Sequence, residues 1–244
     1  YMEKIKFTIA VATYNSSLVI EELLNSIFHQ TYSNYEVVIV DGLSTDNTLE
    51  IAKKWLRSSD KINTEKDSGV YDAMNKALDL ASGDFLIFMG SDDHFMSNRV
   101  LAEVADAINK AGGNLDTVYY GGCYMDAYHT VSNKVWTKWS WVRGTMCHQG
   151  IFYPKEVYKK YKYNLLYKIN ADYAYNINLW NKVNFQHIDV VVSFFTDGGL
   201  SGSNRYDMPF RKDFPFMLRN QCGYFPYAYK QIRLFLGRVF KGRP

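Results

Sequence analysis

Residues 85–93 have the sequence Phe-Leu-Ile-Phe-Met-Gly-Ser-Asp-Asp. An unbroken apolar run of this length predicts a strand that is buried on both faces, as in a parallel sheet. Two adjacent carboxylates, Asp92 and Asp93, follow the run. Like charges oppose each other's ionisation, so a divalent cation that offsets them is favoured. Mg²⁺ and Mn²⁺ prefer oxygen ligands and often join carboxylates to substrate phosphates. The alternative for an isolated Asp pair is a helix cap.

On both sides of this strand, apolar strands alternate with amphipathic helices. We predict strands over residues 7–13, 35–40, 62–65 and 85–89, and helices over residues 18–30, 45–56 and 70–81. Such an order is typical of an α/β fold in which helices cover both faces of a Rossmann-like, mostly parallel central sheet.

Polar side chains stand where the predicted strands end. They are Thr13, Tyr14 and Asn15, then Asp41, Asp67, and the pair Asp92 and Asp93. Ligands of such sheets bind beyond the carboxyl ends of the strands. Each residue alone could be a cap or a turn residue, but their convergence predicts an active site. The first loop lacks GxGxxG and the chain lacks GxxxxGK[ST], which disfavours a nicotinamide-binding domain and a P-loop NTPase.

Composition limits the class of protein. The chain has 244 residues, 47% of them apolar and 22% charged, and a net charge of +3, which is too small to indicate nucleic acid as a partner. Its three cysteines form no CxxC pair and suggest reduced thiols in the cytosol. No apolar stretch approaches the roughly 18 to 20 residues of a membrane span, and no signal peptide is evident. We therefore expect a cytoplasmic protein.

Three segments, residues 9–48, 65–93 and 147–180, together resemble the family 2 glycosyltransferases. The resemblance implies the GT-A fold, with a β-rich acceptor-side region and C-terminal helices, and a nucleotide-sugar donor. It implies a glycosyltransferase domain over residues 1–222, whose halves 1–96 and 97–222 bind donor and acceptor. The nearest type is the bacterial enzymes of O-antigen, capsule or exopolysaccharide synthesis.

The resemblance also assigns roles to single residues. Nucleotide-sugar binding is assigned to a set at the strand ends and beyond: Thr13, Tyr14, Asn15, Asp41, Asp67, Asn75, Asp92 and His148. In the metal motif Gly90 replaces the Asp or Asn of many members. We expect Asp93 to bind Mn²⁺ or Mg²⁺, and Asp92 to reach the ribose or metal-bound water. Asp172 matches the catalytic Asp, although an Asp in this position could also cap a helix.

The resemblance implies an inverting, metal-dependent transfer of one sugar from a nucleotide-sugar to a lipid-linked glycan. UDP is the commonest donor nucleotide in the family. A metal would stabilise charge on the leaving diphosphate, and Asp172 would act as the general base. Two alternatives stay open: a catalytically inactive relative that binds nucleotide-sugars or glycans, and a sugar nucleotidyltransferase. The first loop has neither the glycines nor the basic residue that are usual in the latter.

The segment 223–244 is aromatic and basic. It predicts an amphipathic helix that lies on anionic lipid at the inner face of the cytoplasmic membrane. The alternative is a helix that packs on the domain.

Overall fold

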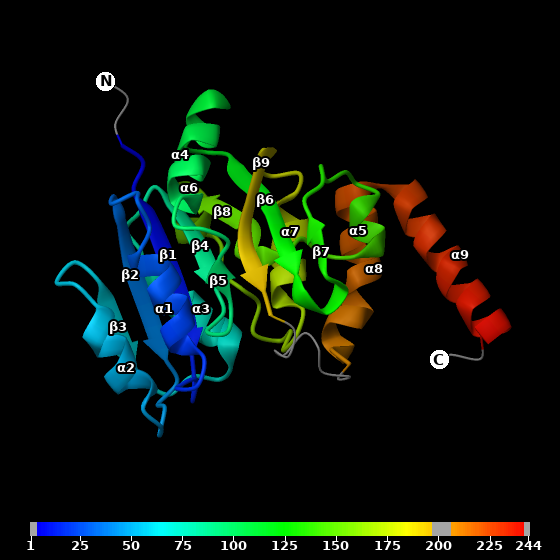
Figure 1. Ribbon diagram of the computed structural model, residues 1–244. Coiled ribbons are helices and arrows are strands. Elements are labelled where there is room, and N and C mark those ends of the chain that lie inside the picture. Colours follow the sequence, from blue (N-terminus) through cyan, green and yellow to red (C-terminus); the bar gives the residue numbers. More distant parts are fainter. Residues whose placement is uncertain (1–3, 197–205, 242–244) are drawn as a thin grey trace.

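The computed structural model describes residues 4–196 and 206–241, and within them a nine-stranded sheet. Its strands are β1 (Phe7–Thr13), β2 (Tyr35–Asp41), β3 (Lys61–Thr64), β4 (Phe85–Met89), β5 (His94–Phe95), β6 (Val118–Met125), β7 (Thr130–Ser132), β8 (Ile151–Pro154) and β9 (Phe185–Phe195). The strand order is β3-β2-β1-β4-β8-β6-β9-β5, and β7 pairs with β6 (Figure 1).

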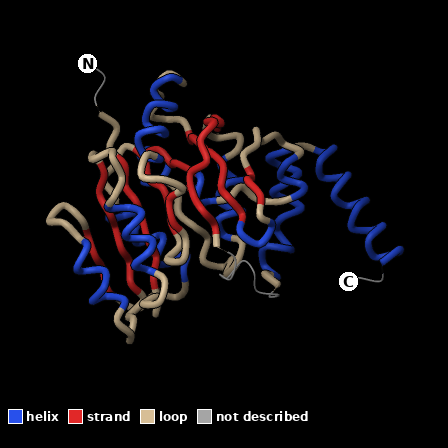
Figure 2. Tube along the Cα trace, in the orientation of Figure 1, coloured by secondary structure: helices blue, strands red, loops and turns tan. Residues whose placement is uncertain are grey.

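Helices surround this sheet. They are α1 (Ile20–Phe28), α2 (Thr48–Trp55), α3 (Val70–Leu80), α4 (Val100–Lys110), α5 (Ser140–Arg143), α6 (Lys155–Lys160), α7 (Ala171–Leu179), α8 (Met208–Cys222) and α9 (Tyr224–Lys241). Two 3-10 turns, η1 (Asp126–Tyr128) and η2 (His148–Gly150), complete the set. Figure 2 shows the strands in the interior and helices on the outside.

The first half of the sheet is parallel, as the sequence predicts. β2 pairs in parallel with β1 and β3, and β1 pairs in parallel with β4. Alternate residues of β1 face opposite sides: Ile9 and Val11 pack with α1, α2 and α4, whereas Ala10 packs with α3, α6 and α7. The continuous apolar runs arise because helices cover both faces.

The second half makes the sheet mixed. β8 pairs antiparallel with both β4 and β6, and β6 pairs in parallel with β9. The region after residue 116 is β-rich as expected, but it also holds α5. Trp141 of α5 is fully buried and its ring centroid lies 4.9 Å from that of Trp136. These two aromatic rings therefore contribute to the core.

The C-terminal helices extend beyond the sheet. α8 packs against α7, and α9 follows it at the right of Figure 1. Lys230 of α9 donates a hydrogen bond to Val142 O of α5 at 2.9 Å. None of the helices within residues 4–196 and 206–241 has the length and apolar character that crossing a membrane requires. Residues 242–244 of the predicted C-terminal segment lie outside the described residues.

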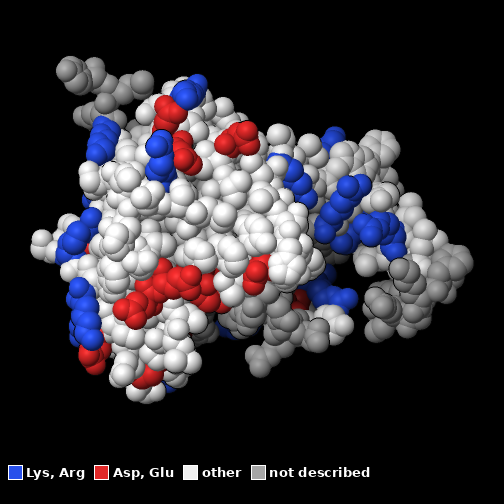
Figure 3. Space-filling view, in the orientation of Figure 1, with Lys and Arg blue, Asp and Glu red and all other residues white. Residues whose placement is uncertain are grey.

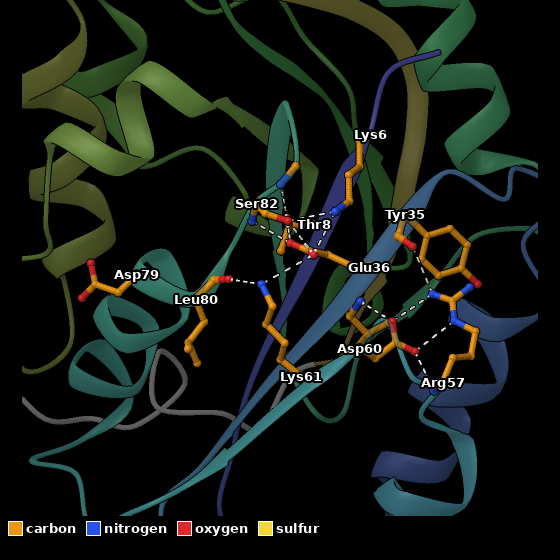
Figure 4. Close-up of polar contacts among 12 residues, drawn as sticks. Lys6, Thr8, Tyr35, Glu36, Arg57, Asp60, Lys61, Asp79, Leu80 and Ser82 are labelled. Carbon is orange, nitrogen blue, oxygen red and sulfur yellow. Dashed lines mark hydrogen bonds and ion pairs between the residues drawn. The ribbon is translucent and has the colours of Figure 1, made fainter. Parts of the chain in front are cut away.

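A charged network fixes the amino ends of the strands, opposite the edge where ligands are expected (Figure 4). The carboxylate of Glu36 in β2 is 2% exposed and accepts hydrogen bonds from Thr8, Ser82 and Lys6. Burial alone would raise the pKa of Glu36. The hydrogen bonds from Ser82, Thr8 and Lys6 outweigh burial and lower that pKa from 4.5 to about 2. The network ties β1 and β2 to the start of β4.

Candidate active site

A pocket of about 640 Å³ opens at the carboxyl ends of β1 and β4. Its walls come from the loop after β1, the start of α3, the loop after β4, η2 and the start of α7. This is the edge at which parallel α/β sheets bind ligands. Five of the residues predicted for the site line the pocket: Tyr14, Asn15, Asp92, His148 and Asp172.

The loop after β1 is held by the loop after β2. Asn15 has a left-handed backbone, with φ of 48°. Its Oδ1 accepts a hydrogen bond from Thr45 N at 2.8 Å, and its N–H donates to Ser44 Oγ at 2.8 Å. Tyr14 next to it is 60% exposed at the pocket. The ring of Tyr14 is therefore free to stack on a planar ligand group.

Three predicted residues lie beneath or beside the pocket wall. Thr13 and Asp41 are buried and face each other as partners in the β1–β2 register. Ser44 donates its backbone N–H, at 2.9 Å, and its hydroxyl to the carboxylate of Asp41. Asp67 accepts from Gly69 N at 2.9 Å. Its Oδ2 is 2.6 Å from the place a Cβ on Gly42 would occupy, so the two loops approach closely.

Asn75 stands apart from the pocket. Its Nδ2 donates to Tyr163 O at 3.0 Å, and its Oδ1 accepts from Tyr163 N at 2.8 Å. Both polar atoms of the amide thus connect α3 to the segment before α7. The structure does not bring Asn75 to the pocket lining, where we predicted a donor contact.

The two carboxylates after β4 have different environments. Asp93 is 1% exposed, and its Oδ2 accepts from Gly90 N at 3.0 Å and from Gln149 Nε2 at 2.8 Å. Its Oδ1 accepts from Thr196 N at 3.0 Å. Burial raises the pKa of Asp93 to about 6, against the effect of the Thr196 hydrogen bond. Asp92, by contrast, lines the pocket. The carboxylate available to a ligand is that of Asp92, whereas we predicted Asp93 as the principal metal ligand.

Gly90 makes this arrangement possible. A Cβ at position 90 would lie 2.6 Å from Asp93 Oδ2 and 3.0 Å from Asp92 Oδ1. Only a residue without a side chain leaves room for both carboxylates in their present positions. The departure at Gly90 therefore has a packing reason, which the sequence alone does not show.

The donor set near Asp92 fits a divalent cation only in part. Within residues 4–196 and 206–241 no group of three or more His, Cys, Asp or Glu side chains could hold a metal ion. Mg²⁺ is commonly held by one or two carboxylates together with substrate phosphates. Asp92 at the pocket wall supplies one such carboxylate, and a diphosphate would supply further oxygens.

Asp172 lies in the first turn of α7 on another wall of the pocket. Tyr71 Oη donates a hydrogen bond to Asp172 Oδ1 at 2.8 Å. His148 Nδ1 lies 3.9 Å from Asp172 Oδ2, beyond hydrogen-bond distance. Burial lowers the pKa of His148 below 6.5, although the charge of Asp172 acts in the opposite direction. The imidazole is therefore mostly neutral at pH 7, and its buried Nε2 has no partner among the described residues.

Two residues that contribute to the site were not predicted from the sequence: Tyr71 and Thr196. Gln149, which we expected beside His148 near the donor diphosphate or the acceptor, lines the pocket. Tyr71 is separated from Asp172 by 101 positions, and Thr196 from Asp93 by 103. Tyr71 could have been found from its place just after the strand-end residue Asp67, at the start of a helix. No sequence pattern indicates Thr196, because its contact with Asp93 depends on how distant segments fold together.

Comparison with known proteins adds independent information. The family described as Glycosyl transferase family 2 matches residues 8–182. A PGL/p-HBAD biosynthesis glycosyltransferase of Mycobacterium bovis is 33% identical over 231 residues, which cover 87% of this chain and 85% of the relative. The poly(ribitol-phosphate) beta-N-acetylglucosaminyltransferase TarS of Staphylococcus aureus is 37% identical over 113 residues, 43% of this chain and 19% of TarS.

Solved structures agree on the fold. S. aureus TarS 1-349 in complex with UDP superposes with a TM-score of 0.70 and 23% identity, covering 97% of this chain and 72% of that chain. A mannosyltransferase of Pyrobaculum calidifontis in complex with GDP-Man and Mn²⁺ has a TM-score of 0.61 at 16% identity, covering 99% and 82%. With the family match over residues 8–182 and the mycobacterial relative over most of the chain, this protein belongs to glycosyl transferase family 2 and is a glycosyltransferase of the GT-A fold.

Proposed function

We propose that this protein is an inverting, metal-dependent glycosyltransferase that moves one sugar from a nucleotide-sugar to a hydroxyl of a lipid-linked glycan. The observation that carries the proposal is the pocket itself: Asp92 and Asp172 line walls formed by different segments of one cavity of about 640 Å³. Such an arrangement gives one carboxylate to a donor diphosphate and the other to an acceptor hydroxyl.

The donor side is formed by Tyr14 and Asp92. The exposed ring of Tyr14 offers a stacking face for a nucleobase. The ribose is positioned by the loops beside Tyr14, which are held in place by Thr13, Asp41 and Asp67. When bound, Mn²⁺ or Mg²⁺ on Asp92 would stabilise charge on the leaving diphosphate as a Lewis acid. The UDP complex of TarS supports a UDP-sugar as the first donor to test.

The acceptor side is formed by Asp172. His148, which the family resemblance assigns to the nucleotide-sugar, lies beside it. In the proposed step the acceptor hydroxyl gives its proton to Asp172 Oδ2 while its oxygen bonds to the anomeric carbon. The bond from that carbon to the diphosphate breaks, and its electron pair leaves with the diphosphate. A single displacement inverts the anomeric centre. A positioned general base of this kind contributes a factor of about 10² to 10⁴ to the rate.

The class of acceptor is a cell-envelope glycan. Named relatives act in PGL/p-HBAD biosynthesis, on poly(ribitol-phosphate) and, as a putative assignment for TuaG of Bacillus subtilis, in teichuronic acid biosynthesis. O-antigen, capsule and exopolysaccharide intermediates belong to the same chemical class. The direct test is transfer of radiolabelled sugar from UDP-, GDP-, dTDP- and CMP-sugars to a bacterial lipid-linked oligosaccharide fraction. Labelled lipid product supports the proposal. Pyrophosphate release from a nucleoside triphosphate and a sugar phosphate would instead indicate a nucleotidyltransferase.

α9 gives this enzyme a means of reaching lipid-linked substrates at the inner face of the cytoplasmic membrane. Phe225, Ile232 and Phe235 are each more than half exposed. Figure 3 shows Lys and Arg side chains over the surface where α5, α8 and α9 lie. An apolar and basic helix surface suits anionic lipid.

Cosedimentation with phosphatidylglycerol vesicles tests this membrane contact. We expect wild type to pellet, and a variant with Ile232→Ser and Phe235→Ser to stay in the supernatant. Phosphatidylcholine vesicles are the control for charge. Equal recovery of wild type in the supernatant with both kinds of vesicle would refute the proposed contact between α9 and the membrane.

A further inference from the structure

The carboxylate of Asp172 is held at one oxygen and open at the other. Tyr71 Oη lies 2.8 Å from Asp172 Oδ1 and 2.6 Å from Ile169 O. The single hydrogen of this hydroxyl is shared between the two acceptors, so the hydroxyl connects the start of α3 to Ile169 before α7 and to Asp172 in the first turn of α7. In the described part of the chain no donor lies within hydrogen-bond distance of Asp172 Oδ2. His148 Nδ1 lies 3.9 Å from this oxygen, which is too far for a hydrogen bond.

The surroundings of Tyr71 keep its hydroxyl in place. Tyr71 is 9% exposed, and its ring lies 5.6 Å from that of Tyr163 at an interplanar angle of 30°. Burial, reinforced by the charge of Asp172, raises the pKa of Tyr71 far above 10. The phenol therefore stays protonated and remains a hydrogen-bond donor over the whole working pH range.

We propose that Tyr71 is a positioning residue for sugar transfer: its hydroxyl holds Asp172 Oδ1, fixes the carboxylate plane, and leaves Oδ2 to take the acceptor's proton. This inference rests on the proposed function, since it takes Asp172 as the general base. A carboxylate that rotated freely would present its oxygens to the acceptor only part of the time. Losses of about 10²-fold follow from small misplacements of this kind.

Five titratable side chains of the described residues lie close enough to Asp172 for its charge to act on them. The titratable side chains whose pKa responds to it are Tyr71 of α3, His148 of η2, Tyr153 of β8, Tyr163 and Tyr173. Burial raises the pKa of Tyr153, Tyr163 and Tyr173 well above 10, so these phenols stay neutral. His148 is mostly neutral at pH 7. Of these five side chains, Tyr71 is the one that donates a hydrogen bond to the Asp172 carboxylate.

The test compares Tyr71→Phe with Tyr163→Phe. Each removes one buried phenol hydroxyl and keeps the ring, but the hydroxyl of Tyr163 has no hydrogen-bond partner among the described residues. We expect Tyr71→Phe to lower kcat by about 10- to 100-fold while the donor Kd changes less than about twofold. A rate that falls while donor affinity stays constant is the result expected of a residue that positions the base, because a general loss of structure would weaken both. Tyr163→Phe should change neither quantity.

A second variant covers the case in which Tyr71→Phe does not fold. 3-Fluorotyrosine at position 71 keeps the shape and strengthens the donor, so kcat should change from its wild-type value while the donor Kd stays within about twofold. A kcat unchanged from wild type in both variants would overturn the inference. Asp172→Asn distinguishes failure of the proposed function from failure of this inference. If Asp172→Asn transfers sugar at the wild-type rate, the assignment of Asp172 as the base fails. If Asp172→Asn is inactive and Tyr71→Phe is unaffected, only the role of Tyr71 is refuted.

Discussion

Replacing Asp172 with Asn isolates proton transfer from binding and folding. The two side chains have nearly the same shape, and the carbonyl oxygen of the amide can still accept from Tyr71 Oη, which lies 2.8 Å from Asp172 Oδ1. The amide nitrogen would face His148, whose Nδ1 is 3.9 Å from Oδ2 and whose lowered pKa keeps it mostly neutral at pH 7. Within residues 4–196 and 206–241, the hydrogen bond from Tyr71 is the one that the Asp172 side chain accepts. It changes from a charged to a neutral acceptor, so unfolding should become easier by about 1 kcal/mol or less.

The catalytic effect should be much larger. An amide cannot accept the acceptor's proton, and loss of a general base lowers rates by about 10²- to 10⁴-fold. This corresponds to about 3 to 5 kcal/mol in the activation free energy. The assay is the initial rate of nucleoside diphosphate release at saturating donor and acceptor, together with the donor Kd. We expect kcat to fall by that factor and the donor Kd to stay within about twofold.

Asp106→Asn is the matched control for this prediction. Asp106 is an exposed residue of α4 that pairs with Lys110, and it does not line the pocket. It should leave both kcat and donor affinity unchanged. A kcat of Asp172→Asn within about threefold of wild type would refute the assignment of Asp172 as the base. A loss of donor binding equal to the loss of rate would place Asp172 on the donor instead.

Two further predictions concern stability. The pKa of Glu36 is about 2 in the folded protein against the usual 4.5, so its contribution to folding stability is present above pH 4.5 and is lost as the pH falls towards 2. Because its partner Lys6 is 38% exposed, we expect Glu36→Gln to lower the free energy of unfolding by about 2 kcal/mol at pH 7 and by much less at pH 3, as measured by urea unfolding. An equal loss at both pH values would contradict this prediction. A Cβ on Gly121 would lie 2.4 Å from Val190 O, so Gly121→Ala should destabilise by about 1 to 3 kcal/mol. Gly144→Ala is its control, since a Cβ there would have no described residue other than its chain neighbours within 4 Å. Equal melting temperatures of the two variants would disprove the clash.

The first half of the fold follows closely from the sequence. Its central strands β1, β2 and β4 are mainly apolar because helices cover both faces. Every strand and helix that we predict between residues 7 and 89 lies within a few residues of its observed bounds. The mixed second half does not follow in this way. β8 pairs with both β4 and β6, and such pairings depend on which distant segments meet rather than on local pattern.

The site, like the fold, has features that follow from the local sequence and features that depend on distant contacts. The principle that ligands bind beyond strand ends was enough to gather Tyr14, Asn15 and Asp92 at one edge. It could not tell which of two adjacent carboxylates faces the pocket, because Gln149 and Thr196 turn Asp93 inward from far along the chain. Nor could it show that the amide of Asn75 connects two segments instead of lining the pocket.

We propose above all that Asp92 at the end of β4 holds the donor diphosphate through a divalent cation. The most direct test is calorimetric titration of UDP, GDP, dTDP and CMP, each with Mn²⁺ or with EDTA, into wild type, Asp92→Asn and Asp106→Asn. We predict that one nucleotide binds wild type and Asp106→Asn in a Mn²⁺-dependent manner. Asp92→Asn should weaken that binding at least about tenfold, which corresponds to about 1.4 kcal/mol. Equal affinity of Asp92→Asn and wild type, or binding that EDTA leaves unchanged, would contradict the account.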